Sequence, residues 1–113
     1  MILIIRERAT PDQMRHMLEV SEIRIKLAVD VERRILAGGG EFHADCEQFL
    51  LIEGSQQVDV WGADWYPFNQ TVGCESIINT RPSADNRSME IQSAELRMRV
   101  SQIVRSLLGD VQW

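Results

Sequence analysis

The sequence changes character at the triplet Gly38-Gly39-Gly40, and this change most constrains the fold. Glycine leaves the backbone unusually free, so it ends helices and forms turns. Directly after the triplet, ionisable side chains occupy every second position. In an extended strand, that spacing places all of them on one face. The pattern predicts a strand that follows a helix and carries the chemistry of the chain, with these ionisable residues: Glu41, His43, Asp45 and Glu47.

The predicted strand continues into a hairpin whose loop is Gly54-Ser55, because glycine at the first loop position suits a type II′ turn. An unbroken strand would turn Phe49, Leu51 and the ionisable residues to the same face, which is the core face. Either a bulge near Glu47 changes the face, or the ionisable groups lie partly desolvated under a helix at the end of the sheet. Buried ionisable groups are seldom left unpaired, so the second arrangement would mark a site.

The part of the chain before the glycines predicts one strand and two helices. Residues 2–6 are apolar on both faces, which is typical of a strand at the centre of a sheet. Thr10-Pro11-Asp12-Gln13 predicts the start of a short helix, with Thr as N-cap and Gln reaching back. Residues 21–37 alternate like a strand but also show helical spacing. Their length, ending at Gly38, favours a helix.

The part after the hairpin predicts a fourth strand, a turn and a final helix. These are residues 75–80, residues 82–86, and a helix that starts from Ser93 and ends at Gly109. The helix has one apolar stripe: Leu96, Val100, Ile103, Val104 and Leu107. The predicted order is β-α-α-β-β-β-α. The fold class is α+β, with helices packed on a mostly antiparallel four-stranded sheet.

Composition limits the classes of function. The 113 residues suit a single domain, 1–113, with a net charge of -5, and no Lys or Arg lies between Ala37 and Thr80. An acidic surface disfavours nucleic acid and favours cations or basic partners. The apolar start is too short for a secretion signal or a membrane span, so we expect a cytoplasmic protein with no membrane role. Cys46 and Cys74 lack metal-type spacing, which favours reduced thiols over a disulfide.

Three motifs occur in one order along the chain: G-G-E-x-H-A-D from Gly39, G-S-x-Q-x-D-x-W-G from Gly54, and N-x-R-P-S-x-x-N-R-S from Asn79. On these motifs, the chain resembles a small single-domain family of unknown function from cyanobacteria, other bacteria and archaea. The resemblance covers roughly residues 26–104. It implies no particular reaction, because that family has no established activity to carry over.

One imidazole with two carboxylates suits Mn, Fe or Zn, so the middle segment carries a metal-site hypothesis: Glu41, His43 and Asp45. No confirmed metal motif, such as a helical H-E-x-x-H, accompanies these residues. Two other interpretations remain open. The residues form a solvated strand face with one hydrogen-bonded histidine, or they take part in acid–base catalysis.

The turn at residues 81–88 offers two guanidinium groups, a hydroxyl and amides that together suit a phosphate or a carboxylate: Arg81, Asn86, Arg87 and Ser88. The alternative is that Arg81 or Arg87 pairs with an acid of the middle segment and holds the turn against the sheet. Aromatic residues near the hairpin suit a small core, a dimer contact or stacking on a ligand ring: Trp61, Trp65 and Tyr66. We expect Cys46 in the core and His16 at the surface.

These observations lead to one functional hypothesis and two alternatives. The first is a small cytoplasmic binding or regulatory protein, a homodimer, that holds a small polar or anionic ligand or partner. The predicted ligand-binding residues are Glu41, His43, Asp45, Arg81, Asn86, Arg87 and Ser88. The first alternative is a divalent-metal-dependent hydrolase of a phosphoester, in which Glu41, His43 and Asp45 hold a metal that activates water. The second alternative gives all these residues purely structural roles.

Overall fold

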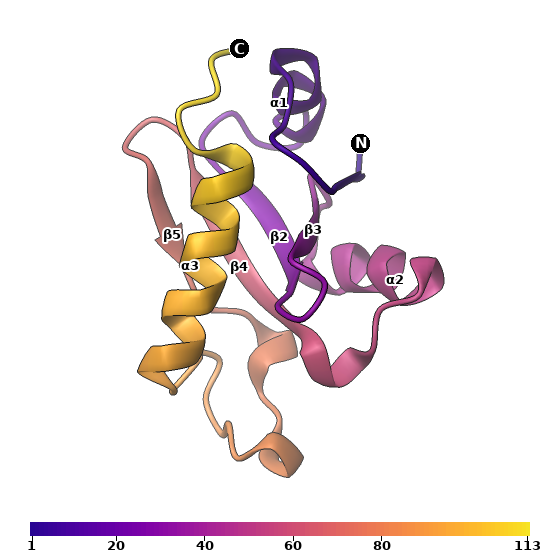
Figure 1. Cartoon of the computed structure of the whole chain (residues 1–113), viewed down its shortest axis with the longest axis vertical. Helices are drawn as coiled ribbons and strands as arrows, with labels where there is room; N and C mark the ends of the chain where they lie inside the picture. Colours follow the sequence, from indigo (N-terminus) through magenta and orange to yellow (C-terminus); the bar gives the residue numbers. More distant parts are fainter.

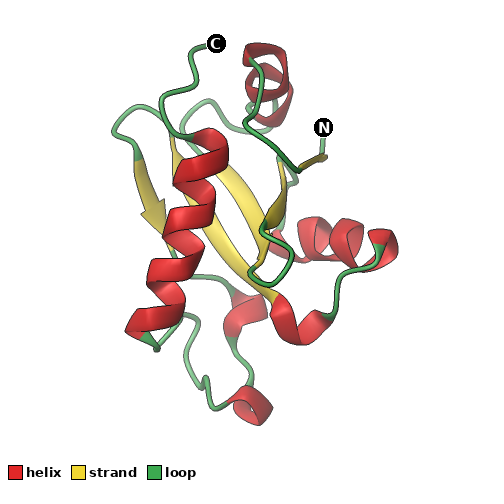
Figure 2. Ribbon diagram, viewed as in Figure 1, coloured by secondary structure: helices red, strands yellow, loops and turns green.

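The computed structural model describes residues 1–113, which form one sheet with helices on both faces (Figure 2). The sheet has five strands in the order β1-β3-β2-β4-β5, and every neighbouring pair is antiparallel. The elements are β1 (Leu3–Ile5), α1 (Pro11–Met17), β2 (Ile25–Asp30), β3 (Ile35–Gly38), α2 (His43–Glu53), β4 (Val60–Tyr66), β5 (Thr71–Gly73) and α3 (Ala94–Leu108). Three short 3-10 turns complete them: η1 (Gln57–Asp59), η2 (Ile77–Asn79) and η3 (Pro82–Ala84). The α+β class is confirmed, whereas the four strands and the order β-α-α-β-β-β-α are wrong.

Residues 21–37 contain the hairpin of β2 and β3, so the predicted helix is wrong. The tight loop contains no glycine or proline. Instead, the Asp30 carboxylate accepts hydrogen bonds from the backbone N–H groups of Glu32 and Arg33, at 3.0 and 2.9 Å. Arg34 adopts a left-handed conformation, φ 59°, and its N–H donates to the Asp30 carbonyl. An aspartate that bonds to its own loop makes the turn that the length argument missed.

The predicted strand after the glycine triplet is also wrong, because residues 43–53 form α2. Its buried residues, Cys46 and Leu50, are four positions apart, as expected on one face of a helix. The consecutive apolar residues 49–52 surround the helix and hide this period. Gly54 is therefore not a hairpin residue. It ends α2 with φ 128° and donates its N–H to carbonyls of the last turn.

Two further strand predictions need correction. The strand at residues 2–6 exists as β1, but it lies at the edge of the sheet and pairs only with β3. Its side chains are apolar in both directions because both sheet faces are covered even there. Residues 75–80 do not form a strand: Glu75 makes one isolated bridge with Glu90, and η2 follows. The predicted turn at residues 82–86 is confirmed as η3 with Asp85 in the left-handed region.

The helix-start predictions are confirmed. The Thr10 hydroxyl accepts from the Gln13 N–H, and the Gln13 side chain accepts from the Thr10 N–H, which makes a capping box. Ser93 caps α3 through the Leu96 N–H, and Gly109 ends that helix. Both starts depend only on neighbours in the sequence, and that is why the sequence predicts them.

The sheet separates two differently built layers. Helices α1 and α3 cover one face, and α3 crosses in front of the sheet in Figure 1. An apolar cluster of 20 buried residues joins them to β2 and β4. Helix α2 covers part of the other face with a cluster of only six buried residues. The rest of the α2 face is left for polar side chains, and the candidate site lies there.

No helix of the structure combines the length and apolarity that crossing a membrane requires.

Candidate functional site

A histidine and an aspartate meet at the N-terminal end of α2. His43 is the first residue of α2, and Asp64 lies on β4, facing the same side of the sheet. His43 Nε2 is 2.9 Å from Asp64 Oδ1, and the two side chains are only 14% and 7% exposed. A carboxylate this deeply buried needs a partner, and His43 supplies one. The contact also fixes the orientation of the imidazole.

Glycines and a cysteine fix the start of α2 over the sheet. A Cβ on Gly40 would lie 3.1 Å from the Cys46 Sγ and 3.0 Å from Ile2, so a larger residue would need these side chains to shift by a few tenths of an ångström. The Cys46 thiol donates to the Lys26 carbonyl on β2. Burial raises the pKa of this thiol to about 11, so Cys46 remains a thiol near neutral pH. Cys46 is therefore an anchor in the core, as predicted, and not a nucleophile.

Two basic side chains flank the pair. Arg24 Nη1 lies 3.8 Å from Asp64 Oδ2, and a hydrogen bond to Tyr66 raises the pKa of Arg24 above its usual value. Lys26, which faces Asp64 across β2 and β4, donates from Nζ to the Glu41 carbonyl at 2.7 Å. His43 and Arg24 therefore lie 2.9 and 3.8 Å from one buried carboxylate, and Lys26 lies opposite Asp64 on the neighbouring strand.

The opposite wall comes from η2, which packs directly on β4 at Gly62. The Asn79 side chain accepts from the Gly62 N–H and donates to its carbonyl, at 2.7 and 3.0 Å. A Cβ on Gly62 would lie 2.6 Å from the Ser76 Cβ, so a larger residue would push η2 away. Gly62 and Asn79 thus hold Ser76 and Ile77 against the polar end of α2.

Between these walls lies a hollow of about 480 Å³, which we call the polar pocket. Its ionisable lining residues are Arg24, Lys26, His43, Asp64, Glu75 and Glu90. The basic groups gather around the His43–Asp64 pair, whereas Glu75 and Glu90 are exposed. The polar pocket therefore offers donors to an anionic group and acceptors to hydrogen-bond donors.

The first turn of α2 adds to the preference for negative charge. Its N-cap is Phe42, and no side chain caps the first turn. Free N–H groups and the positive end of the helix dipole both favour anions at such a terminus. Asp45 is the one acid of this turn, and its residue is exposed.

The predicted metal residues are not brought together. The side chains of Glu41 and Asp45 belong to exposed residues, and only His43 lines the polar pocket. No three His, Cys, Asp or Glu side chains are grouped as ligands of one ion. The α-helix explains the difference, because alternate residues on a helix point in different directions. The divalent metal therefore stays a prediction without support from the geometry.

Arg81 is held by the protein itself and lines a separate hollow beside Glu47. Its guanidinium donates to three backbone carbonyls, those of Ile78, Gln57 and Val60. It also lies 3.3 Å from Glu47 and over the Trp61 ring. Burial raises the pKa of Glu47 despite this pairing and lowers the pKa of Arg81. These contacts agree with the alternative in which Arg81 pairs with an acid and holds the turn in place.

The other predicted residues of the turn lie outside the polar pocket. The buried Asn86 amide donates to the carbonyls of Asn79, Ser88 and Glu90. The Ser88 hydroxyl accepts from the Glu90 N–H, and the Arg87 residue is exposed. His43 and Arg81 line neighbouring hollows, so the predicted meeting of His43 with both arginines in one pocket is absent. The guanidinium near the histidine is that of Arg24.

The sequence reasoning missed Arg24, Lys26 and Asp64. Residues 21–37 were predicted as a helix, which placed the two basic residues away from the sheet. The alternation in residues 23–31 was the available signal, because it puts Arg24 and Lys26 on one face of a strand. Asp64 follows the same logic: it lies between Ala63 and Trp65, which are buried on the opposite face.

The remaining predictions are settled by burial. Trp61 and Trp65 belong to the large cluster, so they are core residues, and Tyr66 is half-buried. Cys74 is a free, partly buried thiol whose pKa is raised by burial. His16 is at the surface, as expected.

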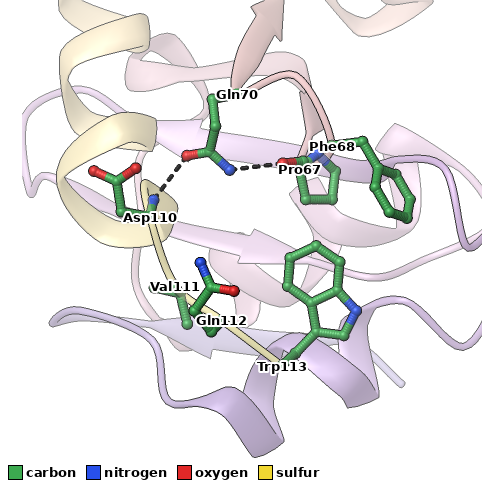
Figure 3. Close-up of a pocket in the computed structure, with 7 residues that line it drawn as sticks. All are labelled: Pro67, Phe68, Gln70, Asp110, Val111, Gln112 and Trp113. Atoms are coloured by element: carbon green, nitrogen blue, oxygen red, sulfur yellow. Dashed lines mark hydrogen bonds between the residues drawn. The ribbon is translucent and has the colours of Figure 1, made fainter.

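A further hollow of about 500 Å³ lies near the C-terminal residues (Figure 3). It has fewer ionisable lining residues than the polar pocket. The Gln70 amide bridges the Pro67 carbonyl and the Asp110 N–H, both at 2.7 Å. Phe68 and Trp113 pack edge to face at one side, with ring centroids 5.8 Å apart. Asp110 is its one ionisable lining residue, so the polar pocket is the stronger candidate site.

Comparison with known families gives one match. A family described as "Protein of unknown function (DUF5674)" matches residues 3–107. No curated protein and no solved structure matches the chain.

Proposed function

Because the chain belongs to the DUF5674 family, whose function is unknown, we propose a function from the geometry of its own site. The protein is a binding protein that holds a small ligand in the polar pocket. An anionic group of the ligand lies against Arg24, Lys26 and His43, and its hydrogen-bond donors face Glu75 and Glu90.

One observation carries this proposal: the His43–Asp64 contact at 2.9 Å, with two further basic groups beside it. Asp64 is already partnered by His43, and Lys26 uses one of its three donors on a backbone carbonyl. Donors therefore remain for a ligand. The uncapped first turn of α2 supports negative charge at the same place.

The proposal differs from the sequence hypothesis in which residues bind. Arg81 and Asn86 already donate hydrogen bonds to backbone carbonyls, so they have few donors left for a ligand. Arg87 and Ser88 lie outside the polar pocket. Of the predicted ligand-binding residues, His43 alone is retained.

A phosphate titration tests the proposal. We expect inorganic phosphate at millimolar concentration to shift the imidazole NMR signals of His43 in a saturable way. The double substitution Arg24→Gln with Lys26→Gln should weaken this binding about tenfold or more, because each removes a charge-assisted contact. Arg87→Gln is the matched control, since it removes an exposed arginine outside the pocket. Equal weakening by Arg87→Gln, or none by the double substitution, would reject the proposed site.

The metal-dependent hydrolase and the homodimer remain predictions, each with its own test. A bound divalent ion should raise the melting temperature, and His43→Ala should remove that rise. Unchanged melting temperatures with Mn²⁺, Zn²⁺ and Mg²⁺ would reject the metal. Sedimentation velocity measures the oligomeric state, and a single monomeric species at micromolar concentration would reject the homodimer.

A further inference from the structure

A second hollow on the α2 face adjoins the polar pocket, and we call it the apolar pocket. Its volume is about 310 Å³, and its apolar lining residues are Phe42, Ala44, Ile77 and Ile78. It shares Lys26, His43, Ser76 and Ile77 with the polar pocket. The two hollows therefore lie side by side at these four residues.

Two large apolar side chains that line the apolar pocket are exposed to solvent. Phe42 is 62% exposed and Ile77 is 78% exposed. Phe42 also occupies the N-cap of α2, where Ser, Thr, Asp or Asn would stabilise the helix better. Single exposed apolar residues are common. A pair that flanks a hollow next to buried ionisable groups is the usual composition of a ligand site.

The backbone holds this pair in place. Ile77 lies on η2, which the hydrogen bonds between Asn79 and Gly62 fasten to β4. Phe42 lies under the Lys26 ammonium, whose Nζ is 5.6 Å from the ring centroid. This cation–π contact joins the apolar pocket to the basic side of the polar pocket. Preorganised walls lower the ordering cost of binding.

We propose that the ligand is amphiphilic: its anionic end lies at Arg24, Lys26 and His43, and an aryl or short alkyl group lies between Phe42 and Ile77. This inference rests on the proposed function and names the chemical class of its ligand. The anionic end is a phosphate or a carboxylate, which present the same charge to the same donors.

The experiment compares probes that share an anionic end. Inorganic phosphate and acetate have no apolar group, whereas phenyl phosphate and phenylacetate carry one. We expect each aryl probe to bind about tenfold or more tightly than its small counterpart, because the ring leaves water. The stronger of the two aryl probes identifies the anion. Binding is measured by the shift of the His43 NMR signals, because the anionic end of all four probes should contact His43.

Substitutions locate the aryl group. Ile77→Ser and Phe42→Ala should each remove most of the gain of the aryl probe, measured in each variant as the affinity of the aryl probe divided by that of its small counterpart; alanine adds no capping hydroxyl to the first turn of α2. Ile52→Ser is the matched control, because Ile52 on α2 is 77% exposed but lines neither pocket. Both tested residues are exposed, and circular dichroism checks that each variant folds.

The outcomes separate the two proposals. If no probe shifts His43, the proposed function fails and this inference fails with it. If phosphate or acetate binds and the aryl probes bind no tighter, the inference is overturned while the proposed function stands. An aryl gain that survives both Ile77→Ser and Phe42→Ala also overturns the inference. An aryl gain lost in both variants but kept in Ile52→Ser supports it.

Discussion

The two faces of the sheet differ in what holds them together. On the α1 and α3 face, 20 buried residues form one continuous apolar cluster. On the α2 face, the apolar cluster has six buried residues, and the remaining area holds the His43–Asp64 pair, Lys26 and two hollows. The first face therefore supplies most of the burial that drives folding. The second can carry polar groups that a core would not tolerate.

This division explains why the candidate site is made of residues that contribute little apolar packing. Only Asp64 among its ionisable residues is buried, and its partners come from two other elements, α2 and the region at the start of β2. We predict that substitutions separate into large stability effects on the α3 face and binding effects on the α2 face.

Leu108→Ala on α3 should destabilise the protein most. Leu108 is fully buried in the large cluster, and removing its side chain leaves a cavity. We expect a loss of about 2–5 kcal/mol in the free energy of unfolding, measured by urea denaturation. Ile52→Ala on the exposed side of α2 is the control and should change stability by about 0.5 kcal/mol or less. Similar losses in both variants would contradict the unequal roles of the two faces.

Gly62→Ala should affect both stability and the site. The added Cβ would lie 2.6 Å from the Ser76 Cβ, so η2 must move. We expect a loss of about 1–3 kcal/mol in the free energy of unfolding, together with weaker phosphate binding. Gly73→Ala on the neighbouring strand is the control for the stability effect alone, because its nearest contact would be an ordinary 3.5 Å but Gly73 lines the polar pocket. Unaltered amide NMR signals from η2 in Gly62→Ala would show that the close contact between Gly62 and Ser76 does not fix the position of η2.

The far end of α2 should show a dependence of stability on pH. Hydrogen bonds from Arg33 and Arg6 lower the pKa of Glu53 to about 2 in the folded protein, from an ordinary value of 4.5. A depressed folded pKa stabilises the protein above the unfolded pKa, so this contribution is lost as pH falls from about 4.5 to 2. Glu53→Gln should flatten the melting temperature over that range. A slope unchanged by Glu53→Gln would assign the acid sensitivity to other carboxyl groups.

His43→Gln should have the smallest effect on stability. The glutamine amide can still donate to Asp64, so we expect the free energy of unfolding to change by about 1 kcal/mol or less. Phosphate binding should weaken, because the imidazole ring that lines the polar pocket is lost. Calorimetric titration and urea denaturation of the same sample measure the two quantities. A large loss of stability with unchanged phosphate binding would make His43 a structural residue.

The sequence predicted correctly those elements that depend on contacts between residues close together in the chain. The caps at Thr10 and Ser93 and the stripe of α3 involve residues within a few positions of one another, and all are confirmed. Residues 21–37 were wrongly predicted as a helix, because the Asp30 side chain forms the turn between β2 and β3 without a glycine or a proline. Helix α2 was wrongly predicted as a strand for two reasons. Its ionisable residues alternate as they would in a strand, and its apolar residues lie all around the helix instead of on one face. The position of β1 at the edge depends on pairing partners that the sequence does not reveal.

The residues of the candidate site were likewise predicted only where sequence neighbours were informative. His43 was predicted from its own neighbourhood, and it does line the polar pocket. Asp64 was overlooked because its partner lies 21 positions away, and Arg24 and Lys26 were overlooked because their strand was predicted as a helix. Arg81 was predicted as a ligand contact because its neighbours resemble an anion site, whereas distant carbonyls on η1 and β4 use its donors.

The most direct test of the central claim is a map of backbone amide NMR shifts during a titration with phenyl phosphate. Our account predicts that the shifts concentrate at residues 42–44, Asp64 and residues 75–77, on the α2 face, and leave residues 81–88 and α3 unchanged. Shifts centred on residues 81–88, or spread over the α3 face, would contradict a ligand site at the His43–Asp64 pair.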